Sequence, residues 1–233
     1  MLGLIPARGG SKGIPRKNLA SLAGRPLLAY TCESALASAA LDRVILSTDD
    51  EEIAAVGRAH GVDAPFLRPD ELARDDTPSI DVVLHALDWL REHESLEPTV
   101  VVLLQPTSPL RRPEHIDHAV ALLRESSADA VVTVTEVPHI FHPVSALTMG
   151  EDGTLSPYVE GEGTRLLRSE DKPVVWARNG PGVCASRVEA VRRNRSLYGS
   201  HTIGLPVGRI ESLDVDDPDD LALCEAVLLG RDG

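Results

Sequence analysis

The sequence predicts a three-layer α/β fold built on a mostly parallel sheet. Short apolar runs recur along the first part of the chain, and stretches with helical periodicity separate them. Strands that helices cover on both faces have few charges, as these runs do. Alternating strands and helices at this spacing form right-handed βαβ units, whose strands lie parallel.

The elements follow in order along the chain. Strands are expected at residues 2–6, 43–47, 99–104 and 128–135. Helices are expected at residues 26–38, 50–60, 79–93, 113–125 and 218–229. Pro26 suits the first helical position, and Gly61 suits the end of the second helix.

The regular pattern breaks near Pro138. Residues 138–172 are richer in Gly, Pro, Glu and short polar runs, and Glu151-Asp152-Gly153 is a candidate hairpin turn. We interpret 138–172 as an arm or lid inserted within a single domain of residues 1–233; a plain surface excursion is the alternative. Regular structure is expected to resume at 174–177.

Composition excludes several classes of function. A net charge of −13 argues against a general nucleic-acid binder, and 3% aromatic residues argue against a base-stacking platform. Arg8 and the glycines interrupt any signal-peptide core, and the longest apolar run, 100–104, is far too short to span a bilayer. The three cysteines are widely spaced, which favours buried thiols. We therefore expect a soluble, cytoplasmic protein without nucleic-acid or membrane partners.

Residues 5–18 read IPARGGSKGIPRKN and form the most informative segment. It places four cations within ten residues: Arg8, Lys12, Arg16 and Lys17. Gly9, Gly10 and Gly13 are expected to allow positive φ angles and a close approach of N–H groups to a ligand. Such a loop suits a polyphosphate, although it is neither a Walker A loop nor a dinucleotide fingerprint. A solvated basic turn is the alternative.

Ligands in parallel sheets bind beyond the carboxyl ends of the strands. The first loop, Ser47-Thr48-Asp49 and residues 105–108 each follow a predicted strand. We therefore expect these three segments to lie along one rim of the sheet.

The first loop, followed by LAGRPLL, resembles the first motif of the acylneuraminate cytidylyltransferases. These enzymes make CMP-sialic acid and related CMP-activated acids from CTP. The likeness covers most of the chain. It implies a Rossmann-like nucleotidyltransferase fold, CTP and a small acidic acceptor as substrates, and a homodimer formed through the inserted arm.

The resemblance assigns the first loop to the triphosphate of CTP. Lys12 and Lys17 would bind the phosphates with Arg8 beside them, and would offset the charge that develops on the leaving pyrophosphate. The other nucleotide contacts implied in this motif are Ala7, Gly9, Ser11 and Asn18. Arg16 is interpreted as a solvated charge outside the site.

Two later motifs complete the resemblance on the substrate side. In RPDELARDDTPS, residues 68–79, Arg68 and Ser79 match residues that hold the cytidine. Taken alone, Thr77 and Ser79 are more often N-cap residues of a helix. In QPTSP, residues 105–109, Gln105 matches a residue near the acceptor sugar and offers both a donor and an acceptor. A turn residue at the strand end is the alternative for Gln105.

Asp214 and Asp216 are the candidate metal ligands. They alternate on an extended segment, which points both carboxylates to the same side. The family carries Asp-x-Asp here, and two hard oxygen ligands with phosphate oxygens and water suit Mg²⁺. Asp216 or a metal-bound hydroxide is the candidate base. Asp217 and Asp219 are assigned to the positive end of the last helix; the alternative is that the whole cluster caps that helix.

The acceptor region departs from the family pattern. Asn179 matches a binding residue, but Pro181 and Gly182 replace the residues that usually follow Asn-Gly. Arg165 and Arg168 are candidate binders of a carboxylate or phosphonate, or plain surface charges. The acceptor therefore stays open between a nonulosonic sugar acid and a phosphonate, and a CTP-binding regulatory protein without catalysis is a third alternative.

Overall fold

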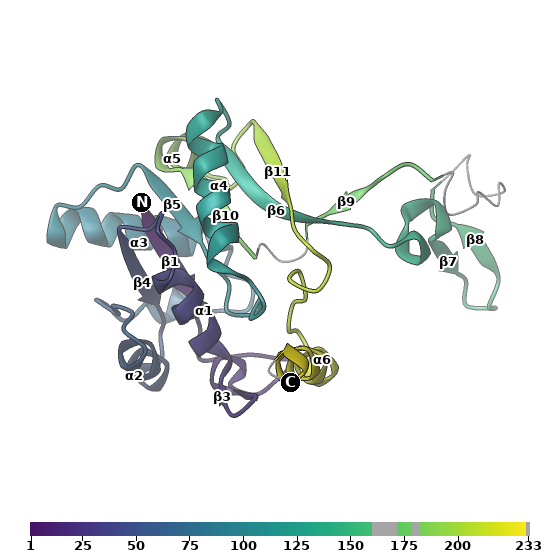
Figure 1. Ribbon diagram of the computed structural model, residues 1–233, viewed down its shortest axis with the longest axis horizontal. Helices are drawn as coiled ribbons and strands as arrows, with labels where there is room; N and C mark the ends of the chain where they lie inside the picture. The colour runs from purple at the N-terminus through teal and green to yellow at the C-terminus, as the bar shows by residue number, and fades with distance from the viewer. Residues whose placement is uncertain (160–171, 179–181, 232–233) are drawn as a thin grey trace. The chain divides into compact units, whose positions relative to one another are not determined.

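A computed structural model describes residues 1–159, 172–178 and 182–231 (Figure 1). The chain divides into two compact units, one formed by Met1–Val134 with Arg178–Gly233 and the other by Thr135–Ala177. No helix in the described ranges is both long enough and apolar enough to cross a bilayer.

In its described part the first unit is built on one sheet with the strand order β11-β6-β10-β5-β1-β4. These strands are β1 (Leu2–Pro6), β4 (Arg43–Ser47), β5 (Val100–Leu103), β6 (Ala130–Glu136), β10 (Cys184–Arg187) and β11 (Thr202–Pro206). β1 lies parallel to β4 and β5, and β11 lies parallel to β6. Only β10 is antiparallel to its neighbours in this order. The predicted mostly parallel sheet is confirmed.

Helices cover both faces of this sheet. They are α1 (Leu27–Leu36), α2 (Glu51–Ala59), α3 (Ser79–Glu94), α4 (Pro113–Glu125) and α5 (Val188–Asn194). The last helix, α6 (Pro218–Arg231), packs in a separate apolar cluster. Because side chains alternate along a strand, Ile5 and Val102 pack with α1, α2 and α4, which form the nearer layer in Figure 1. Leu4 and Val101 pack with α3 and α5 on the other face. The predicted three layers are confirmed.

A smaller apolar cluster holds the C-terminal part of the first unit. It joins the short ribbon of β2 (Ser21–Leu22) and β3 (Arg25–Pro26) to α6, and it includes Leu22, Cys224 and the fully buried Val215. Since Val215 is buried, its two neighbours remain outside this core: Asp214 is half-buried and Asp216 is exposed. The cluster thereby fixes the Asp-x-Asp segment.

The helix starts differ in detail from the prediction. Pro26 is the N-cap of α1, not its first helical residue, because it pairs with Ser21 in the β2–β3 ribbon and keeps an extended ψ of 138°. Pro78 occupies the N-cap of α3 and no side chain caps that helix, so Thr77 and Ser79 are not its caps. Gly61, with φ of 82°, follows α2 as predicted.

In the main sheet and the helices that cover it, β10, α5 and β11 were not predicted. β10 has four residues, and β11 is an edge strand whose residues are at most half-buried. Neither has the long apolar run that marks β1 and β4. Each strand forms beside open hydrogen-bonding groups of the sheet: β10 pairs with β5 and β6, and β11 pairs with β6.

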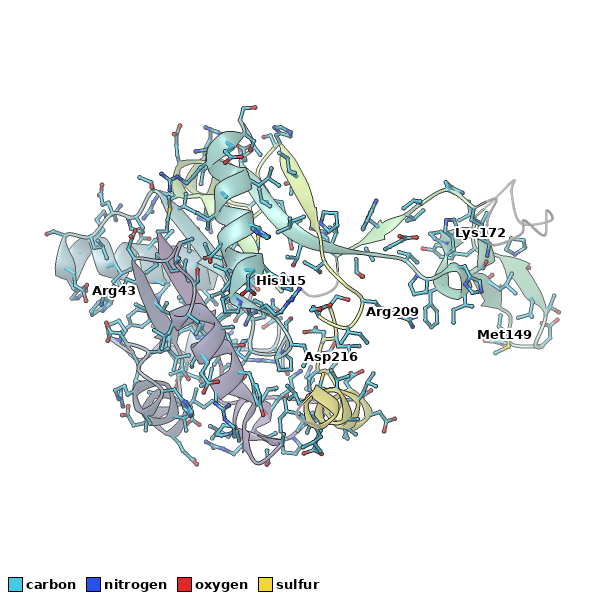
Figure 2. The ribbon with its side chains drawn as sticks, viewed as in Figure 1. Arg43, His115, Met149, Lys172, Arg209 and Asp216 are labelled. Carbon is cyan, nitrogen blue, oxygen red and sulfur yellow. The ribbon has the colours of Figure 1, made fainter. Side chains whose placement is uncertain are left out.

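The described part of the second unit consists of short strands and 3-10 turns. The end of β6 pairs with β9 (Trp176–Ala177), and β7 (Leu147–Met149) pairs with β8 (Leu155–Pro157). Gly153 has φ of 81° between β7 and β8, which confirms the predicted hairpin turn. Two 3-10 turns, His139–Phe141 and Pro143–Ser145, are held by Lys172, whose Nζ donates to the His139 carbonyl and the Ser145 hydroxyl (Figure 2).

Candidate functional site

The loops that follow three parallel strands meet at one edge of the first unit's sheet. β1, β4 and β5 run in the same direction, so their carboxyl ends share that edge. The Ala7 N–H donates to the Ser47 carbonyl, and the Gly9 N–H donates to Asp49 Oδ1 at 3.0 Å. The predicted rim is confirmed.

A cavity of about 410 Å³ opens at this edge. The predicted site residues that line it are Arg8, Ser11, Lys12, Lys17, Asn18, Arg68, Ser79, Gln105 and Asp216. Ala7 is buried in the core, and the Gly9 amide is already bonded to Asp49, so neither lies in the cavity wall. Asn179 lies outside the described residues, as do Arg165 and Arg168.

The first loop contacts the Asp-x-Asp segment directly. Lys17 Nζ donates to the Val215 carbonyl at 2.7 Å and lies 3.1 Å from Asp216 Oδ1. On the other side, the Val215 N–H donates to the carbonyl of Thr107, in the loop after β5. Figure 2 labels Asp216 beside the start of α6. The early lysine and the late aspartate therefore share one site.

In the first loop, Gly13 is required because a side chain would not fit there, and not because of its φ angle. The predicted positive φ angles are wrong for Gly9, Gly10 and Gly13; Arg16 is the residue of this loop in the left-handed region, with φ of 51°. A Cβ on Gly13 would lie 2.1 Å from the backbone oxygen of Asp216, so that position requires glycine for close approach. Arg16 itself pairs with Asp50 at the start of α2, outside the cavity.

Separate aspartates cap α6. Asp217 Oδ1 accepts from the N–H groups of Asp219 and Asp220, and Asp220 Oδ2 accepts from those of Asp216 and Asp217. This reciprocal arrangement is a capping box. The alternative that the whole acidic cluster caps the helix is therefore not supported, because the side chains of Asp214 and Asp216 bond elsewhere.

Asp214 and Asp216 are the two carboxylates predicted to hold Mg²⁺; Asp216 lines the cavity, whereas Asp214 is not among its lining residues. Asp214 Oδ1 accepts from Ser108 Oγ at 3.2 Å, and Asp216 presents its exposed carboxylate at the cavity. Within the described ranges, no group of three or more His, Cys, Asp or Glu side chains could hold a metal. Two carboxylates completed by phosphate oxygens and water are a typical Mg²⁺ environment, whereas a site made wholly of protein ligands is not built here.

Arg68 is a buried cation with spare donors. It is 5% exposed, and its Nη2 lies 3.6 Å from Asp49 Oδ1. Burial lowers the pKa of Arg68, and the nearby Asp49 carboxylate opposes that shift. Its Nε and Nη2 atoms have no hydrogen-bond partner in the described part of the chain. Buried donors of this kind are usually satisfied, so a polar ligand in the cavity is the natural partner.

Asp75 is a residue of the site that sequence reasoning missed. Arg8 Nη1 lies 2.5 Å from Asp75 Oδ1, and Lys12 Nζ lies 2.9 Å from Oδ2. Hydrogen bonds from Lys12 and then Arg8 hold the pKa of Asp75 below its usual value. One carboxylate thus neutralises two cations assigned to phosphate. Asp75 falls within the motif at 68–79, but nothing in its spacing reveals partners more than sixty residues away.

Comparisons with known proteins agree with this geometry. Residues 2–187 match a family described as "Cytidylyltransferase". The chain is 34% identical to CMP-N,N'-diacetyllegionaminic acid synthase of Legionella pneumophila, over 98% of this chain and 96% of that protein. It is 32% identical to N-acylneuraminate cytidylyltransferase of Escherichia coli over 96% of this chain, but it spans about half, 51%, of that longer protein.

A solved structure supports the fold. CMP:2-keto-3-deoxy-manno-octonic acid synthetase, solved in complex with CTP, has a TM-score of 0.69 to this chain and covers 99% of it, and 98% of that chain is matched. At 18% identity this likeness concerns the fold alone. Together, the match over residues 2–187 and the near full-length relative show that the chain belongs to the cytidylyltransferase family.

Proposed function

We propose that this chain transfers CMP from CTP to a nonulosonic sugar acid and releases pyrophosphate. The observation that carries the proposal is the cavity that Arg8, Lys12, Lys17 and Asp216 line together, with Lys17 beside Asp216. The near full-length relative is named for making the CMP derivative of such an acid, which supports this acceptor class. A cation-lined cavity suits a triphosphate, and the carboxylate opposite suits the reacting end.

The transfer forms one bond and breaks one. An acceptor oxygen attacks the α-phosphorus, the bond from the α-phosphorus to the bridging oxygen breaks, and pyrophosphate leaves with that electron pair. Arg8 and Lys12 neutralise charge on the departing phosphates, and Lys17 holds the triphosphate against the Asp-x-Asp segment. Asp216 accepts the proton that the acceptor hydroxyl loses, because its exposed carboxylate lines the cavity, where Lys17 Nζ lies 3.1 Å from its Oδ1.

The remaining residues of the site bind and orient the metal ion, the cytidine and the acid. Asp214 and Asp216 would hold Mg²⁺, which supplies neutralisation of phosphate charge when bound. Arg68 and Ser79 face the cytidine, and Gln105 faces the acid. Asn179 is assigned to the acid as well.

Pyrophosphate release tests the proposal. The purified chain, CTP and Mg²⁺ are incubated with a nonulosonic acid, with a phosphonate, or with no acceptor, and CTP binding is measured separately by calorimetry. Release with the nonulosonic acid is expected. Release with the phosphonate alone would move the acceptor to the second class. CTP binding without release under every condition would favour a regulatory protein.

We also propose a homodimer formed through the second unit, in a cytoplasmic enzyme. The second unit exposes large apolar side chains, among them Phe141, Tyr158 and Met149, the last 74% exposed (Figure 2). Exposed apolar groups in this number are typical of an interaction surface. Sedimentation should show a dimer that Phe141→Asp with Met149→Asp dissociates. A wild-type monomer at all working concentrations would contradict the dimer.

A further inference from the structure

Arg111 is a buried arginine that the proposed chemistry leaves unused. It is 4% exposed, and no ion pair holds it within the described residues. Burial lowers its pKa to about 9, and the Asp214 carboxylate opposes the shift without touching it. A buried charge without a paired partner is costly, and an apolar residue of similar size would serve packing at least as well. The free-energy cost of burying Arg111 therefore indicates that this residue has a role other than packing.

The guanidinium of Arg111 joins three segments that are far apart in sequence. Its Nη1 donates to the Gln105 carbonyl at 3.1 Å and to the Gly182 carbonyl at 2.6 Å. Its Nη2 donates to Thr31 Oγ1 at 2.6 Å, and that hydroxyl donates in turn to the Gln105 carbonyl at 3.5 Å. The planar fork of arginine makes these contacts together, whereas a lysine presents one nitrogen.

Two of these segments carry the groups assigned to the acid. Gln105 is held through its own carbonyl, and the residue lines the cavity. Gly182 directly follows residues 179–181, the segment that carries Asn179. Ser108, in the same loop as Gln105, bonds Asp214. The contacts of Arg8, Lys12 and Lys17 do not involve Arg111.

We propose that Arg111 is a positioning residue for the acid acceptor. It sets the Gln105 loop against the entry to β10, and it thereby fixes where the acid lies relative to CTP. This inference rests on the proposed function for its substrate, but the bonds that it invokes exist without any ligand. If Arg111 has this role, its substitution should lower kcat/KM for the acid and leave the dissociation constant of CTP unchanged.

The kinetic test compares Arg111→Lys with Arg112→Lys. Arg112 is the next residue and is exposed, its Nη2 lying 3.7 Å from Glu211, so it is a matched control. In Arg111→Lys, kcat/KM for the acid should fall roughly 10- to 100-fold, the scale of a reactant misplaced by about 1 Å. The dissociation constant of CTP should not change. Equal losses for acid and CTP would show a merely structural role and overturn the proposal.

A second measurement needs no substrate. Hydrogen exchange of the wild type, Arg111→Lys and Arg112→Lys should show faster exchange at both 105–108 and 182–184 in the first variant alone. Unchanged exchange at these segments would overturn the proposal even for an active enzyme. If the wild type turns over no acid, the proposed function fails, while the exchange result still decides the role of Arg111.

Thr31→Val provides a milder variant should Arg111→Lys not fold. It removes the hydroxyl and keeps the shape, so the effect on the acid should be smaller and in the same direction. Because Thr31 and Arg111 hold the same carbonyl, the two changes should not be additive in the double variant. Full additivity would contradict a shared task.

Discussion

The loops after β1 and β5 both carry cations, and they use them in opposite ways. In the first loop, Lys12 has 81% of its side chain exposed and pairs with a carboxylate that a ligand can replace. In the second loop, Arg111 is buried and bonds backbone carbonyls that cannot leave. Position in the fold, rather than charge, therefore decides whether a cation is available to a ligand or fixes the shape of the loop.

Among the variants considered, substitution of Asp216, the carboxylate that faces the first loop, should reduce activity most. Asp216→Ala should lower Mg²⁺-dependent pyrophosphate release by about 10³-fold, the scale of a lost group that stabilises transition-state charge. Its side chain is 78% exposed and caps no helix, so the thermal midpoint should not change. Asp219→Ala, an exposed change in the first turn of α6, is the control. Wild-type turnover in Asp216→Ala would refute the assignment.

A smaller effect tests how the first loop approaches the Asp-x-Asp segment. Gly13→Ala places a Cβ 2.1 Å from the Asp216 backbone oxygen, so loop and segment must separate. The free energy of unfolding should fall by about 1–3 kcal/mol, the usual cost of overpacking. Denaturant melts of Gly13→Ala and Gly10→Ala make the comparison, because Gly10 has open space at the same atom. Equal stability of the two variants would show that the contact can relax.

A substitution of Asp75, with a modest expected effect, tests whether CTP can replace the ion pairs of the first loop. Asp75→Asn frees Arg8 and Lys12, so CTP should bind a few-fold more tightly at low salt, because exposed ion pairs contribute only about 0–1 kcal/mol. Asp75 is the exposed partner of both cations, and its neighbour supplies the control variant, Asp76→Asn. Calorimetry at two salt concentrations measures the gain. Weaker CTP binding would instead make Asp75 a residue that orients the cations.

The pH dependence of the effect of Asp75→Asn follows from the direction in which the pKa of Asp75 is shifted. The pKa of Asp75 is lowered from 3.8, so the carboxylate stays charged in the fold at every pH above that value. Its pairing is therefore fully present at neutral pH and is lost only as pH falls through the lowered pKa. The ratio of CTP affinities between Asp75→Asn and wild type should stay constant between about pH 6 and 8. A ratio that changes across this range would require another titrating group.

The weakest effect concerns two buried thiols, those of Cys32 and Cys184. Burial raises the pKa of Cys32 to about 12, despite the opposing charge of Arg111, and raises that of Cys184 to about 11. Neither thiol should react with a thiol reagent at pH 8 in the native protein, and both should react once it is unfolded. Rapid native labelling would show that this region opens.

The sequence alone predicted the elements that carry long apolar runs. Strands β1 and β4 and helix α4 match the prediction to the residue, because polar residues flank β4 and α4 and because β1 ends at Pro6. The antiparallel β10 was missed because its four residues, Cys184–Arg187, carry no long apolar run. In the site, motifs indicated most of the cavity wall, whereas Asp75 and Arg111 depend on partners about seventy positions away.

The position of β10 has a consequence for how the chain reaches its native state. β5 and β6 do not pair with each other; β10 lies between them, and it comes after the second unit in the chain. Until residue 187 has emerged from the ribosome, both strands expose open edges, which are sites of aggregation. Lengthening the connection from β6 to β10 adds little closure entropy, since that cost grows only with the logarithm of length. Evolution can therefore enlarge or trim the second unit cheaply, whereas a nascent chain halted before β10 is left with a sheet in two halves.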